Sequence, residues 1–464
     1  MNSKDNLSVK LQEYTKKDMY PFHMPGHKRM LEGAYKLDIT EIEGFDNLNN
    51  PQGILRKMNE DIAKMYDSDL SYFTVNGSTC GNLSAISAAT ELGDTILIAR
   101  NCHRSVINAA IIRNLNVEYV MPSYYNDYFP GAVLLSDIES AVENLISNKD
   151  KPKAVVITSP TYEGVVSDIP RISEYLHAKE IVLITDSAHG AHMHFHDAFP
   201  RDYIEYADIC IMSAHKTLPV LNQAAMVHVN SKLIDPENVM RYISIYQTSS
   251  PSYVIMESMS RSLESINEKN FDGYVKKLED FYQEAATLEK LSLEPISEDR
   301  DMGKIIIYTN GYIDGKKLHH MLREEYNLEL EMYNKHYLLA MTSIMDSYDG
   351  FRRLIDALRS IDKTLGDKKY GNNNEKIVKI FQQRKGRTKS HKLTTKFELK
   401  PIKDCVGRAS STIIMAYPPG IPIIMPGEII ENDDIVYIEE RDVILYYREK
   451  FHRERYYFQA LIEE

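Results

Sequence analysis

A regular alternation of short apolar stretches and amphipathic stretches runs from about residue 51 to residue 229, and it constrains the fold most strongly. The apolar stretches are rich in Val, Ile and Ala, which is typical of strands buried on both faces of a parallel sheet. Stretches of crossover length with helical spacing separate most of them. The pattern predicts an α/β fold, with a mostly parallel seven-stranded sheet covered by helices on both faces.

The predicted elements can be given by their residue ranges. The strands are expected at 72–75, 95–99, 117–120, 154–158, 181–185, 208–212 and 225–229. The helices between them are expected at 54–66, 81–92, 104–115, 135–146 and 172–177.

The rest of the chain indicates further parts around this large domain. The predicted parts are an N-terminal arm (1–50), the large domain (51–246), a small α+β domain (247–365), a linker (366–387) and a C-terminal α+β domain (388–464). The arm begins with an amphipathic helix that we expect to pack on a partner subunit. The small domain is expected to open with one long helix over 254–288, and the C-terminal domain to contain a strand at 435–438.

Composition limits the classes of function. The chain has 464 residues, enough for two or three domains, and a net charge of −12, which argues against nucleic acid as a partner. No apolar run approaches the roughly 18 residues that cross a membrane, and the first residues lack the apolar core of a signal peptide. Four cysteines without metal-type spacing indicate a reduced, cytoplasmic protein.

A lysine stands directly after one of the predicted strands. The strand at 208–212 runs into Ser213-Ala-His-Lys216. Because open α/β sheets bind ligands at the carboxyl ends of their strands, we expect Lys216 at the ligand-binding edge. A lysine removed from bulk water is nucleophilic and forms a Schiff base with an aldehyde, although a solvated surface lysine is the commoner case.

Two further motifs favour the reactive lysine. The strand at 181–185 ends in Asp186-Ser-Ala-His189, which places a carboxylate beside Lys216. The segment Asn76-Gly-Ser-Thr79 precedes a predicted helix and offers a tight turn, hydroxyl groups and free amides to a phosphate. Pyridoxal phosphate requires all three, since its aldehyde binds a lysine and its ring nitrogen a carboxylate.

Several motifs together resemble the bacterial ornithine/lysine/arginine decarboxylases, which belong to the aspartate-aminotransferase-like pyridoxal-phosphate enzymes (fold type I). The resemblance covers about residues 20–440. It rests on 181–190, 207–219, Asn76-Gly-Ser-Thr79, Arg100-Asn-Cys-His-Arg-Ser105, Phe22-His-Met-Pro-Gly-His-Lys28, Thr248-Ser-Ser-Pro-Ser252 and Pro418-Pro-Gly-Ile-Pro422. The chain lacks the N-terminal wing domain of the long inducible members and is similar to the short biosynthetic members.

This resemblance implies an α-decarboxylase for arginine, lysine or ornithine that works as a homodimer or a larger homo-oligomer. It favours a role in polyamine synthesis over one in acid resistance. A small basic amino acid is the expected partner, with neither nucleic acid nor membrane.

The resemblance also implies a role for each matching residue. Lys216 is expected to bind the cofactor aldehyde, Asp186 the ring nitrogen, His103 one face of the ring and Ala188 the other. His189 is expected beside the cofactor, and the residues expected at the phosphate are Ser78, Thr79, Ser213 and His215, with Ser249 or Ser250 reaching the phosphate bound in a neighbouring subunit.

We predict that Lys216, His215, Asp186 and His103 form the catalytic set, with His215 or Lys216 returning a proton to the α-carbon. The distal cation of the substrate needs a carboxylate. The carboxylates considered are Glu428, Asp46 and Glu43, and Glu428 comes first because it lies in a rigid Pro-Gly-Glu turn.

Two other classes of function have some support. In an extended segment His192, His194 and His196 share one face and could bind zinc in a hydrolase. That function leaves Lys216 unexplained, so no metal is predicted. An aminotransferase of the same fold, or a lyase, is the nearer alternative, since Arg352 or Arg353 could bind an α-carboxylate.

Overall fold

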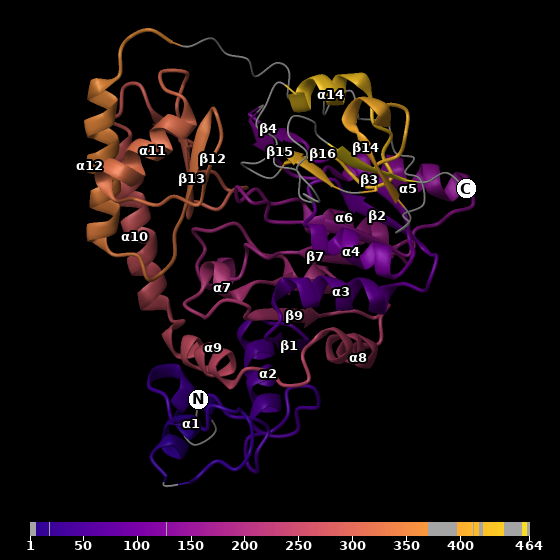
Figure 1. Ribbon diagram of the computed structural model, residues 1–464, viewed down its shortest axis with the longest axis vertical. Coiled ribbons are helices and arrows are strands. Elements are labelled where there is room, and N and C mark those ends of the chain that lie inside the picture. Colours follow the sequence, from indigo (N-terminus) through magenta and orange to yellow (C-terminus); the bar gives the residue numbers. More distant parts are fainter. Residues whose placement is uncertain are drawn as a thin grey trace. The chain divides into compact units, whose positions relative to one another are not determined.

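The computed structural model describes residues 6–17, 19–126, 128–369, 397–411, 413–416, 421–439 and 457–461. Its largest sheet has seven strands in the order β1-β9-β8-β7-β6-β2-β3 (Figure 1). The strands are β1 (Leu70–Thr74), β2 (Thr95–Ala99), β3 (Asn116–Val120), β6 (Ala154–Thr158), β7 (Val182–Asp186), β8 (Ile209–Met212) and β9 (Ala225–Val229). Each predicted strand is present, and the α/β prediction is confirmed.

Strand direction decides which chain segments meet at one edge of this sheet. β7 runs parallel to β8, and β2 runs parallel to both β3 and β6. β9 is antiparallel to β8 and to β1, so β1 runs in the same direction as β8. The carboxyl ends of β1, β7 and β8 therefore lie at the same edge, which is where such sheets bind ligands.

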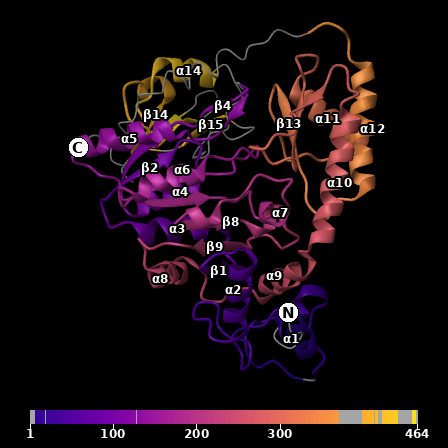
Figure 2. The same ribbon diagram turned by 180° about the vertical axis from the view of Figure 1, so that it is seen from behind.

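Helices follow the strands of this sheet, as the sequence predicted. They are α2 (Ile54–Met65), α3 (Gly77–Ala89), α4 (Arg104–Ile112), α5 (Leu135–Ser147), α6 (Ile169–His177), α7 (Ala214–Thr217) and α8 (Pro236–Tyr246). α3 packs against α8 and β9 (Figures 1 and 2). A Cβ atom at Gly81 would lie 2.6 Å from Cγ2 of Ile211, so glycine permits this close approach of α3 to β8.

The contacts divide the chain into two compact units. The first contains Met1–Ala89, Ile169–Tyr274 and Ser343–Met345, and the second contains Thr90–Asp168, Val275–Thr342 and Asp346–Glu464. The predicted domains are continuous segments, whereas these units interleave along the chain. The predicted limits therefore stay predictions.

The second unit contains a four-stranded antiparallel sheet in the order β10-β11-β13-β12. Its strands are β10 (Ser292–Leu293), β11 (Lys304–Tyr308), β12 (Met332–Tyr333) and β13 (Tyr337–Met341), with helices α11 (Gly315–Tyr326) and α12 (Tyr348–Thr364) beside it (Figure 1). A short hairpin, β4 (Tyr124–Tyr125) and β5 (Phe129–Pro130), packs onto this sheet through the buried Phe129 and Tyr337.

The single long helix predicted at 254–288 is wrong. The chain forms α9 (Tyr253–Ser265) and α10 (Glu268–Ala285). Ile266 between them has an extended backbone, with ψ of 102°. The side-chain oxygen of Asn267 then accepts a hydrogen bond from the backbone N–H of Asn270 (3.1 Å), and such a local bond favours a new helix start over continuation.

The predicted N-terminal helix is present as α1 (Leu7–Thr15). Its buried residues Leu7 and Leu11 face α9 of the same chain, and Ser8 Oγ donates to Glu257 Oε1 at 2.7 Å. The apolar face of this helix, which we expected to pack on a partner subunit, is thus covered within the chain.

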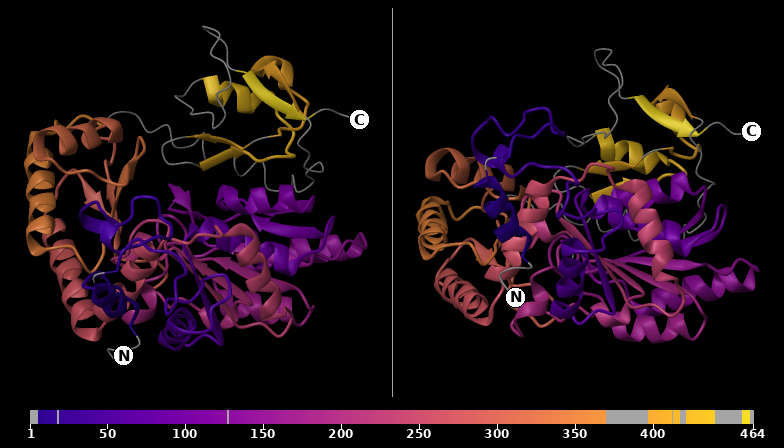
Figure 3. Two further views of the ribbon diagram at one scale, coloured as in Figure 1. Left: turned by 60° about the horizontal axis from the view of Figure 1, so that its bottom comes forward. Right: turned by 90° about the horizontal axis from the view of Figure 1, so that it is seen from below.

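The C-terminal part contains two short antiparallel pairs (Figure 3). They are β14 (Phe397–Pro401) with β17 (Tyr457–Leu461), and β15 (Ile414–Ala416) with β16 (Ile421–Ile424). The strand predicted at 435–438 is wrong, because Asn432–Glu439 forms helix α14. Asp434 in its first turn accepts from the backbone N–H of Glu431 (2.9 Å), which stabilises a helix start. Most of the predicted linker and residues 418–420 lie outside the described residues.

Within the described ranges, no helix combines the length and the apolarity that crossing a membrane requires.

Candidate active site

Lys216 lies at the carboxyl edge of the large sheet. β8 ends at Met212, and the single-turn helix α7 (Ala214–Thr217) places Lys216 directly after it. The Nζ atom of Lys216 lies 3.0 Å from Nε2 of His189, which belongs to the motif that follows β7. The two motifs that the sequence placed on neighbouring strands therefore meet.

Asp186 is the last residue of β7 and is only 2% exposed. Its Oδ2 atom accepts a hydrogen bond from Nδ2 of Asn82 at 2.9 Å, and its Oδ1 atom accepts from the backbone N–H of Ala188 at 3.3 Å. Burying a carboxylate is costly unless such donors compensate for lost water. These bonds fix the orientation of the carboxylate at the sheet edge.

Asn82 was missed by the sequence reasoning. It is fully buried on α3, the helix that starts at the predicted phosphate turn. One signal was available, because Asn82 lies four residues after Ser78 and so on the same face of that helix. One helix thus carries both the phosphate turn and the donor that holds Asp186.

The predicted phosphate turn lies at the same edge. Gly77 has a left-handed backbone (φ of 71°) and donates its N–H to the carbonyl of Gln223 at 2.8 Å. The hydroxyl oxygens of Ser78 and Ser213 are 2.5 Å apart, and Thr79 is exposed in the first turn of α3. An anion here would meet hydroxyl groups and the positive end of a 13-residue helix.

His215 has a defined tautomer. Its Nδ1 atom lies 2.8 Å from the carbonyl oxygen of Ala224, which can only accept, so Nδ1 carries the proton. Burial lowers the pKa of His215, the bond to Ala224 opposes this change, and the charge of Lys216 lowers it further. His215 is therefore neutral at physiological pH, with Nε2 as an acceptor.

These residues fit pyridoxal phosphate. A buried carboxylate with fixed donors suits the ring nitrogen, a half-buried lysine suits the aldehyde, and two facing serines at a helix start suit the phosphate. Ala188 and His189 are buried beside them, at 9% and 6% exposure. All of these residues belong to the first unit.

His103 belongs to the second unit. It precedes α4 as its N-cap, and its Nδ1 atom accepts from the backbone N–H of Ser105 at 3.3 Å. His103 is an exposed residue. Ser249 and Ser250, in the turn before α9, are exposed as well.

The three carboxylates predicted for the substrate cation have different surroundings. Glu43 is exposed. Asp46 accepts from the backbone N–H groups that lead into α2, at Asn47, Gln52, Gly53 and Leu55. Burial alone would raise the pKa of Asp46, but these donors together lower it. Asp46 therefore anchors the start of α2.

Glu428 is buried and bonded to an arginine. Its Oε1 and Oε2 atoms accept from Nε and Nη2 of Arg100 at 2.7 and 2.6 Å. Only 3% of Arg100 and 6% of Glu428 are exposed. Both oxygens are engaged, which leaves little capacity for a substrate cation.

The histidine segment is not extended, so the premise of the zinc site is wrong. Met193–Phe195 forms a 3-10 helix. His194 pairs with Asp202 at 3.0 Å, and His196 pairs with Asp272 at 3.3 Å. Among the residues that the structure describes, no group of three or more His, Cys, Asp or Glu is placed to hold a metal ion.

The arginines that favoured an aminotransferase lie on the surface of α12. Arg352 is 70% exposed and pairs with Asp349 one turn earlier at 2.5 Å. Arg353 is exposed and donates to the carbonyl oxygens of Tyr326 and Asn327. Neither side chain has the surroundings of a buried carboxylate site.

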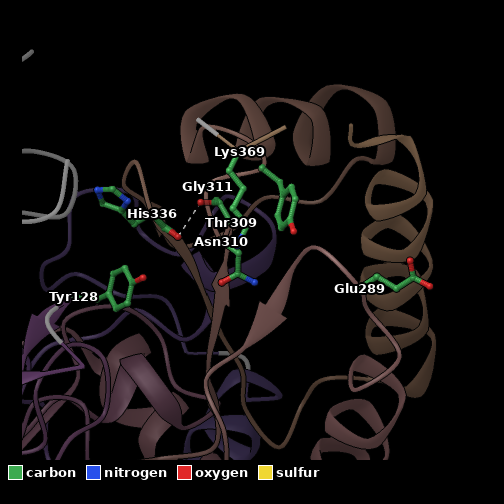
Figure 4. A pocket seen from close by; sticks show the side chains of 8 residues that line it. Tyr128, Glu289, Thr309, Asn310, Gly311, His336 and Lys369 are labelled. Atoms are coloured by element: carbon green, nitrogen blue, oxygen red, sulfur yellow. Dashed lines mark hydrogen bonds between the residues drawn. The ribbon is translucent and has the colours of Figure 1, made fainter. Parts of the chain in front are cut away.

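The second unit also contains a polar cavity of about 260 Å³, lined by Tyr128, Glu289, Asn310, His336 and Lys369 among others. Figure 4 shows Tyr128 and His336 at one side of it and Glu289 at the other. The ammonium group of Lys369 lies 4.9 Å from the ring centre of Tyr312. None of the sequence-predicted residues lines this cavity.

Comparison with known proteins identifies a family whose models match this chain. Its residues 6–339 match the family model of the Orn/Lys/Arg decarboxylase major domain, and residues 378–443 match the C-terminal domain of that family. Arginine decarboxylase of Bacillus subtilis is 27% identical over 93% of this chain and 92% of its own length. The uncharacterized protein YaaO of the same organism is 31% identical, over 92% of each chain.

A solved structure supports the fold. The lysine decarboxylase LdcF of Francisella novicida superposes with a TM-score of 0.83 over 99% of this chain and 81% of its own, at 19% identity. With the site geometry and the family match over most of its length, the chain belongs to the Orn/Lys/Arg decarboxylase family.

Proposed function

We propose that this decarboxylase removes the α-carboxylate of a basic amino acid with the help of pyridoxal phosphate. One observation carries the proposal. Asp186 ends β7 and Lys216 follows the adjacent parallel strand β8, and Ser78 and Ser213 meet at the same edge. Carboxylate, lysine and phosphate turn are the three features that this cofactor requires.

The residues of this chain would hold the cofactor as the sequence predicted. Lys216 would bind its aldehyde and Asp186 its ring nitrogen. Ala188 and His103 would cover the two faces of the ring, and His189 would lie beside it. The residues proposed at the phosphate are Ser78, Thr79, Ser213 and His215. When bound, the cofactor supplies a conjugated ring that accepts the electrons of the broken bond.

Side chains of this chain would set the charge at the ring nitrogen and transfer protons near Lys216. The charge of Asp186, fixed by Asn82, favours a proton on the ring nitrogen and keeps the ring electron-poor. Lys216 lies within hydrogen-bond distance of His189, so a proton can pass between Nζ and Nε2.

The α-carbon that loses carbon dioxide must gain one proton. We propose His215 or Lys216 as the donor. The carbonyl of Ala224 holds the His215 ring with Nε2 unprotonated, so Nε2 can receive a proton from solvent and pass it on.

Arginine is the substrate that we propose first. Relatives from Bacillus subtilis and Halalkalibacterium halodurans, aligned over at least 91% of their length, bear the name arginine decarboxylase. Lysine decarboxylase of Hafnia alvei aligns over only 54% of this chain. Of the three carboxylates predicted to bind the distal cation, Glu43 alone is exposed and without a structural bond among the described contacts.

We further propose a homodimer. Residues 19–35 carry exposed apolar side chains, among them Met19, Tyr20, Phe22 and Met30, and Phe22 is 91% exposed. A group of this kind on one short segment is typical of a protein interface. Ser249 and Ser250, which we propose to reach a phosphate in the neighbouring subunit, are exposed as that role requires. Sedimentation of the purified protein should give twice the chain mass.

The test of the reaction is direct. The purified protein with pyridoxal phosphate is given arginine, lysine or ornithine in separate reactions, and released carbon dioxide is measured. We expect release from arginine above the other two and none from Lys216→Ala. Transfer of the amino group to a 2-oxo acid, with no carbon dioxide from any of the three, would identify an aminotransferase instead.

A further inference from the structure

The pair of Arg100 and Glu428 is built as a buried clamp. Its two parallel hydrogen bonds form the bidentate geometry that is strongest for these groups. Glu428 Oε2 also accepts from the backbone N–H of Met425 at 2.9 Å, which closes the turn around Gly427. A buried ion pair of this quality holds two chain segments in one relative position, because separating them would leave both charges away from water.

The clamp joins the C-terminal part to the carboxyl ends of two strands of the large sheet. Arg100 follows β2 directly, and its backbone N–H donates to Val120 at the end of β3 (2.9 Å). The hydroxyl group of Tyr119 donates to the carbonyl of Pro426 at 3.1 Å. The turn 425–428 is therefore fixed at two points against this edge, and all of these residues lie in the second unit.

The segment held by the clamp carries His103. Cys102 donates its backbone N–H to Ala99 at 2.9 Å, so residues 99–102 form a tight turn with Arg100 inside it. His103 comes next and caps α4. A displacement of Arg100 would be transmitted to His103 through a turn of three peptide units.

We infer that Glu428 is a positioning residue, which through Arg100 fixes the turn 99–103 and so the imidazole of His103. This inference rests on the proposed function, since it requires His103 to contact the cofactor. It gives the C-terminal part of the chain a role at the active site without any contact with the substrate.

The test is a double-mutant cycle with cofactor affinity as its readout. The dissociation constant of pyridoxal phosphate is measured by absorbance titration for the wild type, Glu428→Gln, His103→Ala and the double variant. We expect Glu428→Gln to weaken binding about tenfold in the wild type and to have almost no effect once His103 is absent. An equal loss in both backgrounds, or no loss in either, overturns the inference.

Two further variants serve as a substitute and as a control in this test. Arg100→Lys keeps the positive charge but cannot form both parallel hydrogen bonds to Glu428. If Glu428→Gln fails to fold, Arg100→Lys should instead weaken cofactor binding only when His103 is present. Glu398→Gln is the matched control, because Glu398 pairs with Arg408 in the same C-terminal part but its side chain is 42% exposed. It should leave the affinity unchanged. A wild-type protein that binds no cofactor at all would overturn the proposed function itself.

Discussion

Asp186 and Glu428 are both buried carboxylates near the carboxyl ends of strands in the large sheet, yet their partners give them opposite properties. Asp186 receives hydrogen bonds from a neutral amide and a backbone N–H group. Glu428 accepts two hydrogen bonds from the guanidinium group of Arg100. A neutral partner orients a carboxylate and leaves its charge to act on a ligand, whereas a guanidinium neutralises that charge. The partner of a carboxylate at a sheet edge thus decides whether its charge stays available to a ligand.

The largest effect is expected when the ion pair of Arg100 and Glu428 is broken. Arg100→Met leaves the buried Glu428 without its cation and should lower the free energy of unfolding by about 3–5 kcal/mol. The double variant Arg100→Met/Glu428→Leu removes both charges and should recover most of that loss. Urea unfolding monitored by circular dichroism measures both. Equal destabilisation of the single and double variants would show that the charges do not depend on each other.

The role proposed for Asp186 is tested by Asp186→Asn. This change keeps the shape of the side chain but removes the charge that we propose to face the ring nitrogen. The rate should fall about 10²–10³-fold, the usual cost of losing one electrostatic group at a reacting centre. Steady-state carbon dioxide release gives the value, and an unchanged unfolding curve shows that the fold is kept. A rate within twofold of the wild type would contradict the role of Asp186.

Glu163 is a third buried carboxylate, and its bonded partner is the phenol group of Tyr337. Glu163 accepts from Tyr337 Oη at 2.9 Å, and burial raises its pKa from 4.5 to about 7. The folded state therefore binds the proton more tightly than the unfolded state. The stability that this proton contributes is complete below pH 4.5 and is lost as the pH rises through 7.

Relative to Glu163→Gln, the wild type should therefore lose about 3 kcal/mol of unfolding free energy between pH 4.5 and 7. Denaturant unfolding of both proteins across this range measures the difference. Parallel curves for the two proteins would mean that Glu163 has an ordinary pKa.

A smaller effect is expected when the neutral partner of Asp186 becomes charged. Asn82→Asp has the same shape as the wild type but places a second carboxylate about 3 Å from the first, and two such groups cannot both ionise easily. The pair should share a proton at neutral pH, so that the rate falls about tenfold there and recovers as the pH rises. The measurement is the pH profile of the rate, and a profile parallel to that of the wild type would contradict the coupling.

The smallest effect is expected at Arg352, whose partner Asp349 is exposed on the same helix. Arg352→Gln should change the unfolding free energy by less than about 0.5 kcal/mol and leave carbon dioxide release unchanged. A loss of activity would revive the suggestion that this arginine binds an α-carboxylate.

The positions of Lys216 and Asp186 at one edge of the sheet could be predicted because their signals are local. Asp186 ends one apolar strand and Lys216 follows the end of the next, and parallel strands bring such positions to one edge. The turn at Gly77 and Ser78 precedes a helix and is readable in the same way. The strands themselves were predicted correctly because most of their residues are apolar.

The pairing of these residues with their partners could not be predicted, because the two members of each pair lie far apart along the chain. Asn82 and Asp186 are 104 positions apart, and Arg100 and Glu428 are 328 positions apart. Nothing local distinguishes a free carboxylate from one that a distant arginine binds, which is why the sequence ranks Glu428 first of the three candidates for the substrate cation. The break at Ile266 and helix α14 were not predicted, because local side-chain hydrogen bonds determine these helix starts and the apolar periodicity does not show them.

The central claim is that Lys216, Asp186 and the turn at Ser78 form one site for pyridoxal phosphate in this decarboxylase. The most direct measurement is the absorbance spectrum of the protein after reconstitution with the cofactor and gel filtration, for the wild type, Lys216→Ala and the exposed-lysine control Lys276→Ala. The account predicts a visible band in the wild type and the control that is lost in Lys216→Ala and shifts when arginine is added. A wild-type protein that stays colourless, or a band that survives in Lys216→Ala, would contradict it.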